Sequence, residues 1–133
     1  MIIEKVRSLV KRYKTNDPFE IAEHFGIEIL YAPLDSVNGC YWKVYGQKII
    51  IVNSNQDERL YKFIVAHELC HALYHSSLTC LYTQGYHVKE KYERQAHEFA
   101  TKLLMYNIDI EEDKTKKFYL MENNVPYEMS RYI

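Results

Sequence analysis

The segment His67-Glu68-Leu69-Cys70-His71 constrains the fold most strongly, because its spacing produces chemistry only on a helix. Two histidines four residues apart lie on one helical face, about one turn apart, so both imidazoles can reach one zinc ion at about 2 Å. Glu68 lies beside that face, where its carboxylate can take a proton from a water molecule without ligating the metal. The motif therefore predicts a helix that carries a metal site.

A catalytic zinc usually takes three protein ligands, so another part of the chain must supply the third. The extended motif HExxHxxGxxH is excluded, since Tyr74 stands at its glycine and Ser77 at its third histidine. A second long helix is predicted from about Lys89 to Met105. One stripe of that helix can pack closely on the first because it holds two small residues. The stripe consists of Glu93, Ala96, His97, Ala100 and Leu104. Glu93 can complete a His₂Glu site.

The rest of the chain reads as an α+β domain, with a small antiparallel sheet of three or four strands packed on helices. Hydrophobic periodicity and capping residues predict helices over 2–14 and 18–26, a long helix from Asn55 to about His75, and a helical stretch from Glu111 to Tyr119. Asn55 and Glu58 resemble a capping box. The predicted strands are Ile27–Tyr31, Cys40–Tyr45 and Lys48–Val52, and 76–88 reads as a loop. Without repeats or linkers, 1–133 is expected to form a single domain.

Composition excludes several classes of protein. The 133 residues carry 17 Lys+Arg and 18 Asp+Glu, and a net charge of -1 gives no global attraction to nucleic acid or anionic membranes. The first helix is locally basic, which is more typical of a solvated face than of a DNA contact. No apolar run is long enough for a membrane span. The three cysteines form no CxxC pair, which favours the cytoplasm over a secreted disulfide framework.

Four segments in this order resemble the ImmA/IrrE-type zinc metallopeptidases. They are PFEIAEHFGIEILY at 18–31, KIIIVN at 48–53, AHELCHALYH at 66–75 and ERQAHEFATKLLM at 93–105. The resemblance implies a zincin-like fold with HExxH on a long central helix. It also implies zinc held by His67, His71 and Glu93, with Glu68 as the catalytic carboxylate.

The chain departs from the family pattern at His97, where relatives usually have Asn or Asp. His97 is expected either to orient a metal ligand through a ring nitrogen or to compete with Glu93 as the third ligand. Glu93 is favoured because the resemblance implies it. His75 follows His71 at the same four-residue spacing. It is expected to interact with the helix dipole at the C-terminus or to contact a metal ligand, not to be a ligand itself.

Tyr82, Tyr86 and His87 lie in the sequence between the two metal-site segments. Each carries a donor that can stabilise an oxyanion, although a chain with 13 tyrosines places some in any loop. Tyr41 and Trp42 can shape a substrate edge, with core packing as the simpler expectation.

The resemblance implies a cytoplasmic, zinc-dependent endopeptidase whose substrate is a helix-turn-helix repressor of a mobile element or stress response. The alternative is a zinc-binding regulatory module that binds a repressor without cleaving it. A third hypothesis is DNA binding through the basic first helix, which predicts strongly salt-dependent affinity. The oligomeric state stays open.

Overall fold

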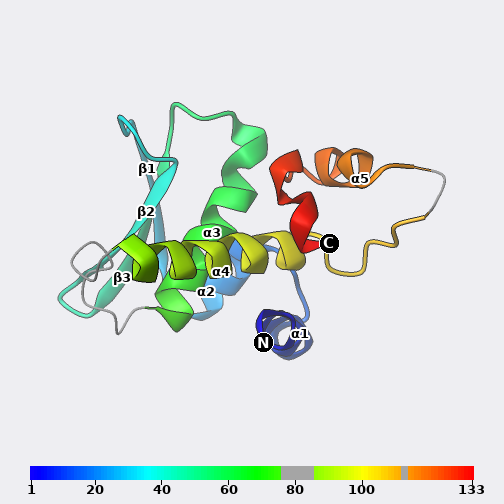
Figure 1. Cartoon of the computed structure of the whole chain (residues 1–133). Coiled ribbons are helices and arrows are strands. Elements are labelled where there is room, and N and C mark those ends of the chain that lie inside the picture. Colours follow the sequence, from blue (N-terminus) through cyan, green and yellow to red (C-terminus); the bar gives the residue numbers. More distant parts are fainter. Residues whose placement is uncertain (76–85, 112–113) are drawn as a thin grey trace.

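The computed structural model describes residues 1–75, 86–111 and 114–133, and for 86–88 the backbone alone. Figure 1 shows the arrangement of its helices and strands. In chain order they are α1 (Ile2–Tyr13), α2 (Pro18–His24), β1 (Glu28–Ala32), β2 (Gly39–Val44), β3 (Gln47–Asn53), η1 (Glu58–Leu60), α3 (Tyr61–Tyr74), α4 (Tyr86–Leu104), α5 (Lys116–Glu122) and η3 (Tyr127–Tyr132). The α+β class is therefore confirmed.

The three strands form a mixed sheet in the order β1-β3-β2. β2 and β3 form the expected antiparallel hairpin, and Tyr45 and Gly46 connect them with φ values of 49° and 82°. Positive φ at both turn residues matches the twist of the flanking strands. β1, however, pairs with β3 in parallel, with Leu30 opposite Ile51, so the expectation of an all-antiparallel sheet was wrong.

The physical reason lies in the composition of β3. Its run of apolar residues suits a central strand, and Ile50 and Val52 are completely buried. The segment that leads from β1 to β2 is fixed by hydrogen bonds to the buried side chain of Asn53, at the end of β3. The Asn53 side chain accepts hydrogen bonds from the backbone N–H of Leu34 and Asn55, and it donates to the carbonyls of Leu34 and Val37.

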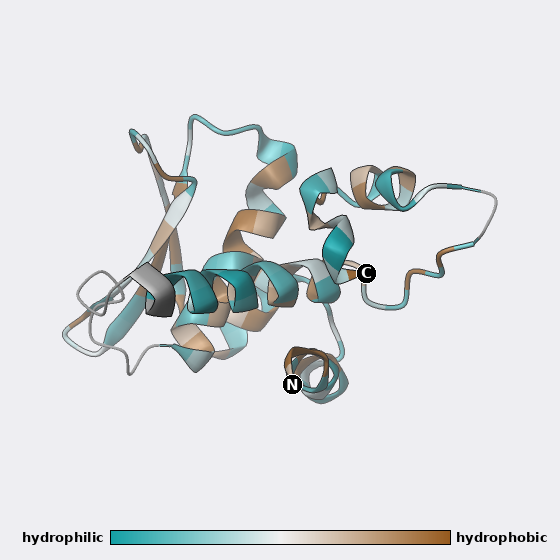
Figure 2. Cartoon of the chain, viewed as in Figure 1, coloured by the Kyte–Doolittle hydropathy of each residue, from teal (hydrophilic) through white to brown (hydrophobic). Residues whose placement is uncertain are grey.

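α3 packs against the sheet on one side and against α4 on the other. Figure 1 shows α4 crossing α3, and Figure 2 shows that the side of α4 turned toward the viewer is largely hydrophilic. The contact between the helices is close because Ala96 and Ala100 are fully buried, as their small size predicted. Phe99 and Leu103 fill the core beside them.

Three helix starts differ from the sequence prediction. Asn55 and Glu58 do not form a capping box; the Asp57 side chain instead accepts from the backbone N–H of Arg59, and α3 begins later, at Tyr61. α4 begins at Tyr86, earlier than expected. α5 starts at Lys116 because the side chain of Thr115 caps it.

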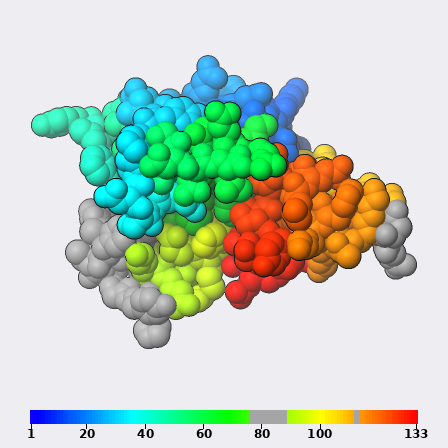
Figure 3. Space-filling model, turned by 90° about the horizontal axis from the view of Figure 1, so that it is seen from above, coloured from blue at the N-terminus to red at the C-terminus, as the bar shows by residue number. Residues whose placement is uncertain are grey.

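The C-terminal η3 contacts α4, and Figure 3 shows this red segment beside the yellow-green part of α4. In the described ranges, no helix combines the length and the apolar character needed to cross a membrane. Because α3 contacts the sheet and α4 contacts η3, the α3–α4 contact lies between the sheet and the C-terminal segment.

Candidate metal centre

The crossing of α3 and α4 brings together the side chains that the sequence singled out. His67, Glu68 and His71 come from α3, and Glu93 and His97 come from α4. The His67 ring centroid lies 5.0 Å from that of His71 and 4.7 Å from that of His97. Residues 22 or more positions apart in the chain therefore meet at one point.

The Glu93 carboxylate faces two imidazoles at once. Its Oε2 lies 3.1 Å from Nε2 of His67, and its Oε1 lies 2.9 Å from Nε2 of His71. Burial opposes ionisation of Glu93, but its hydrogen bond with His67 and its attraction to both histidines prevail and hold its pKa well below the usual range. Burial alone would lower the pKa of His67, yet Glu93 and Glu68 raise it. The site thus combines an ionised carboxylate with two imidazoles.

His71 has a second contact on its other ring nitrogen. Its Nδ1 lies 2.9 Å from Nδ1 of His75, and Nε2 of His75 lies 2.9 Å from Oε1 of Gln95. His71 and His75 are both only 5% exposed. Burial lowers the pKa of His75, which favours its neutral imidazole. His75 therefore contacts a candidate ligand, as its place in the sequence suggested.

His97 lies on the other side of His67, stacked on the ring of Phe63 with centroids 6.5 Å apart. Burial and the neighbouring charge of His67 lower the pKa of His97. Candidate ligand atoms of His67, Glu93 and His97 all lie within 4.8 Å of one another. Two candidate ligand sets result: His67, Glu93 and His97 meet this spacing, and in the set His67, Glu93 and His71 each histidine contacts a different Glu93 oxygen.

Glu68 is enclosed beside the histidines and is 8% exposed. Its burial and the nearby Glu93 charge raise its pKa, while His67 and His71 partly offset them. The β2 strand begins next to Glu68: a Cβ added to Gly39 would lie 3.5 Å from Cγ of Glu68. A buried carboxyl with a raised pKa is suited to accept and return a proton.

The donor set fits a zinc ion. Ligand atoms held at about 2.0–2.1 Å around a tetrahedral zinc are about 3.3 Å apart, close to the 3.1 Å and 2.9 Å separations of Glu93 from His67 and His71. Nε2 of His71 is a buried atom without a hydrogen-bond partner among the described residues. This nitrogen lies 2.9 Å from Oε1 of Glu93, but the contact does not have the geometry of a hydrogen bond. A buried nitrogen facing a carboxylate in this way is suited to share a cation with it.

The cysteine of the motif packs in the core, where Cys70 is fully buried. This burial raises the pKa of its thiol to about 12. This agrees with the packing role expected from the sequence.

Some sequence candidates lie outside what the structure describes. Tyr82 is among these residues, and for Tyr86 and His87 only the backbone in α4 is described. Sequence reasoning missed Gln95 and Tyr92, which contact His75. Their i, i+3 spacing on α4 was the available signal, but only the tertiary crossing reveals what that face meets.

Comparison with known proteins identifies similar chains. The family model for the peptidase M78 group, described as the IrrE N-terminal-like domain, matches residues 22–132. "Uncharacterized immunity region protein 2" of Bacillus phage phi105 is 30% identical over 137 aligned positions, covering 98% of this chain and 87% of the phage protein. "Metallopeptidase ImmA" of Bacillus subtilis strain 168 is 33% identical over 108 positions, covering 78% of this chain and 63% of that relative.

Proposed function

Because this chain belongs to the IrrE N-terminal-like family of peptidases, we propose that it is a zinc-dependent endopeptidase. The observation that carries the proposal is the meeting of His67, His71 and Glu93 beside the buried Glu68. A binding site for zinc alone has no need of an extra buried carboxylate next to its ligands. The same surroundings suit a general base.

His67, His71 and Glu93 are the proposed zinc ligands. His71 is favoured over His97 because its buried Nε2 faces Glu93 without a hydrogen bond, whereas His97 stacks on Phe63. Two histidines and a glutamate are also an established catalytic zinc set. His97 is then a neighbour of His67 that restricts how that ring turns.

A zinc ion held there would act as a Lewis acid that polarises the scissile carbonyl and lowers the pKa of the attacking water. Glu68 accepts the proton that the water loses and returns it to the leaving amine. Because its pKa is raised, the Glu68 carboxylate is a stronger base than that of an exposed glutamate. Glu93 and the two histidines stay in place throughout.

We propose that the substrate is a helix-turn-helix repressor of a mobile element or stress response, and that cleavage relieves repression in the cytoplasm. The support is a relative whose name assigns it to a phage immunity region and another named as the metallopeptidase ImmA. The net charge of -1 also favours a protein substrate over nucleic acid. The match covers 63% of the ImmA relative, so the substrate of this chain is a proposal and is not transferred from that protein.

An extended part of the substrate can pair with β2, which is an edge strand that begins beside Glu68. Trp42 in this strand is 59% exposed, so the simpler expectation that it packs in the core was wrong. Its ring is available to a substrate side chain. This pairing would bring the scissile bond along the edge toward Glu68.

The test is to incubate the protein with the repressor encoded nearest to its gene. Three samples are compared by gel and mass spectrometry: zinc-loaded protein, protein treated with a chelator, and treated protein with zinc returned. We expect two repressor fragments in the first and third samples and intact repressor in the second. Intact repressor in all three, with binding retained, would favour the regulatory module over the peptidase.

A further inference from the structure

A line of polar contacts leads away from the candidate metal centre, through α3 to the outer side of α4. Nδ1 of His71 contacts Nδ1 of His75 at 2.9 Å, and Nε2 of His75 contacts Oε1 of Gln95 at 2.9 Å. The ring of Tyr92 lies 4.6 Å from that of His75 and limits its rotation. Three side chains are thus joined in series.

The chemistry of these groups sets the direction of each hydrogen bond. The Gln95 Oε1 atom only accepts, so Nε2 of His75 must donate. A neutral imidazole has one N–H, which leaves Nδ1 of His75 as an acceptor. The proton between the two Nδ1 atoms therefore belongs to His71, and the Nε2 atom of His71 is left with a lone pair.

That lone pair is where a metal ligand needs it. Nε2 of His71 is buried, lies 2.9 Å from Oε1 of Glu93, and has no hydrogen-bond partner within the described part of the chain. Two electron-rich atoms at this distance repel each other unless a cation lies between them. With the opposite tautomer, the N–H would block the position of the metal.

We propose that His75 and Gln95 are positioning residues that hold His71 in the Nδ1–H tautomer and so present its Nε2 to zinc. The inference rests on the proposed zinc site. Partners of this kind typically change metal affinity by about 10- to 100-fold when they are removed.

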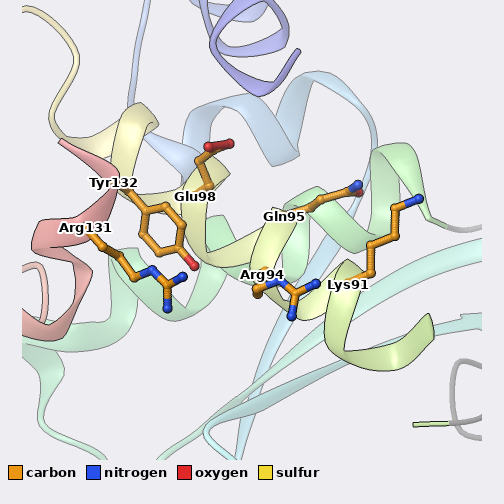
Figure 4. Close-up of a pocket in the computed structure, with 6 residues that line it drawn as sticks. All are labelled: Lys91, Arg94, Gln95, Glu98, Arg131 and Tyr132. Carbon is orange, nitrogen blue, oxygen red and sulfur yellow. The ribbon is translucent and has the colours of Figure 1, made fainter. Parts of the chain in front are cut away.

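The outer end of this series is accessible to substitution. Gln95 lines an open pocket of about 300 Å³ between α4 and η3, together with Lys91, Arg94, Glu98, Arg131 and Tyr132 (Figure 4). A changed side chain at position 95 therefore meets open space and not the core. The nearby Lys91 and Arg94 would also keep a carboxylate at this position ionised.

The experiment measures zinc affinity by competition with a chromophoric chelator. Gln95→Met keeps the length but removes the acceptor, Gln95→Glu keeps an acceptor, and Arg94→Ala is a neighbouring control whose partner is Glu90. We expect Gln95→Met to weaken zinc binding about 10- to 100-fold, with Gln95→Glu and Arg94→Ala within about threefold of the wild type. Circular dichroism of the metal-free proteins checks that each variant is folded.

Nitrogen-15 NMR of the metal-free wild type provides a second readout, because imidazole shifts report the tautomer directly. We expect His71 protonated at Nδ1 and unprotonated at Nε2. An Nε2–H tautomer, or a Gln95→Met variant that binds zinc as tightly as Arg94→Ala, would overturn the inference while leaving the peptidase proposal intact. A wild type that binds no zinc would overturn both.

Discussion

A residue without a side chain, Gly39, lies beside Glu68 where β2 meets α3. Gly39 opens β2 directly against α3, where a Cβ would lie too close to Ile64 and to the carbonyl of Ile51 and in ordinary contact with Glu68. Its φ is not the reason, since only Gly26 and Gly46 have positive φ among the described glycines. The requirement is space.

Gly39→Ala is predicted to destabilise the protein and disturb the site. Its Cβ would lie 2.7 Å from Cγ2 of Ile64 and 3.0 Å from the carbonyl oxygen of Ile51, so α3 or β2 must shift. Overpacking of this kind lowers the free energy of unfolding by about 1–3 kcal/mol. Urea denaturation measures the loss, and cleavage of the repressor should fall because Glu68 moves with α3.

Gly46→Ala is the matched control. A Cβ there meets open space, but φ is +82°, so the variant loses about 1 kcal/mol of stability through backbone strain alone. It should keep wild-type cleavage, because the turn is remote from Glu68. If Gly39→Ala proves as stable and active as the wild type, the close approach has no functional weight.

At the scale of elements, hydrophobic periodicity indicated the helices and strands, and the HExxH spacing indicated the metal motif, because these depend on local sequence. It could not give the sheet order, since the parallel pairing of β1 with β3 depends on which strand is buried most completely. The helix starts also depended on the caps: Asp57 prevailed where Asn55 was expected, and Thr115 caps α5 later than the expected start at Glu111. The contact of His75 with Gln95 required the helix crossing itself.

One contact between elements is predicted to contribute measurably to stability. The Lys48 ammonium of β3 donates a 2.8 Å hydrogen bond to the carbonyl of Ala72, in the last turn of α3, where a cation also complements the helix dipole. Lys48→Met should lower the free energy of unfolding by about 1–3 kcal/mol. Thermal and urea unfolding of the metal-free protein measure it.

Lys43→Met is the control, because Lys43 lies opposite Lys48 in the β2–β3 ladder and is exposed. Removing this like charge should leave stability within about 0.5 kcal/mol or raise it slightly. Equal losses in the two variants would show that the bond to Ala72 does not stabilise α3.

For the whole molecule, zinc binding is predicted to be coupled to folding, because the proposed site joins two helices that are distant in sequence. Zinc at 100 times its Kd should stabilise the fold by about 2.7 kcal/mol, and the melting temperature should rise accordingly. The gain should shrink as the pH is lowered, since protons compete with zinc for its ligands. Calorimetry with and without zinc measures the shift.

Variants of the site separate its two available ligand sets. His67→Ala and His71→Ala should abolish the zinc-induced rise in melting temperature, whereas His97→Ala should retain most of it. The reverse pattern, with His71→Ala retaining the rise and His97→Ala losing it, would assign the third position to His97 in place of His71.

The central claim is that Glu68 and a zinc site together hydrolyse a peptide bond. The most direct measurement is intact-mass spectrometry of the repressor after incubation with zinc-loaded wild type and with zinc-loaded Glu68→Gln. We predict two fragments whose masses sum to the repressor plus one water for the wild type, and intact repressor for Glu68→Gln despite equal zinc content. Intact repressor with both proteins, or equal cleavage by both, would contradict the account.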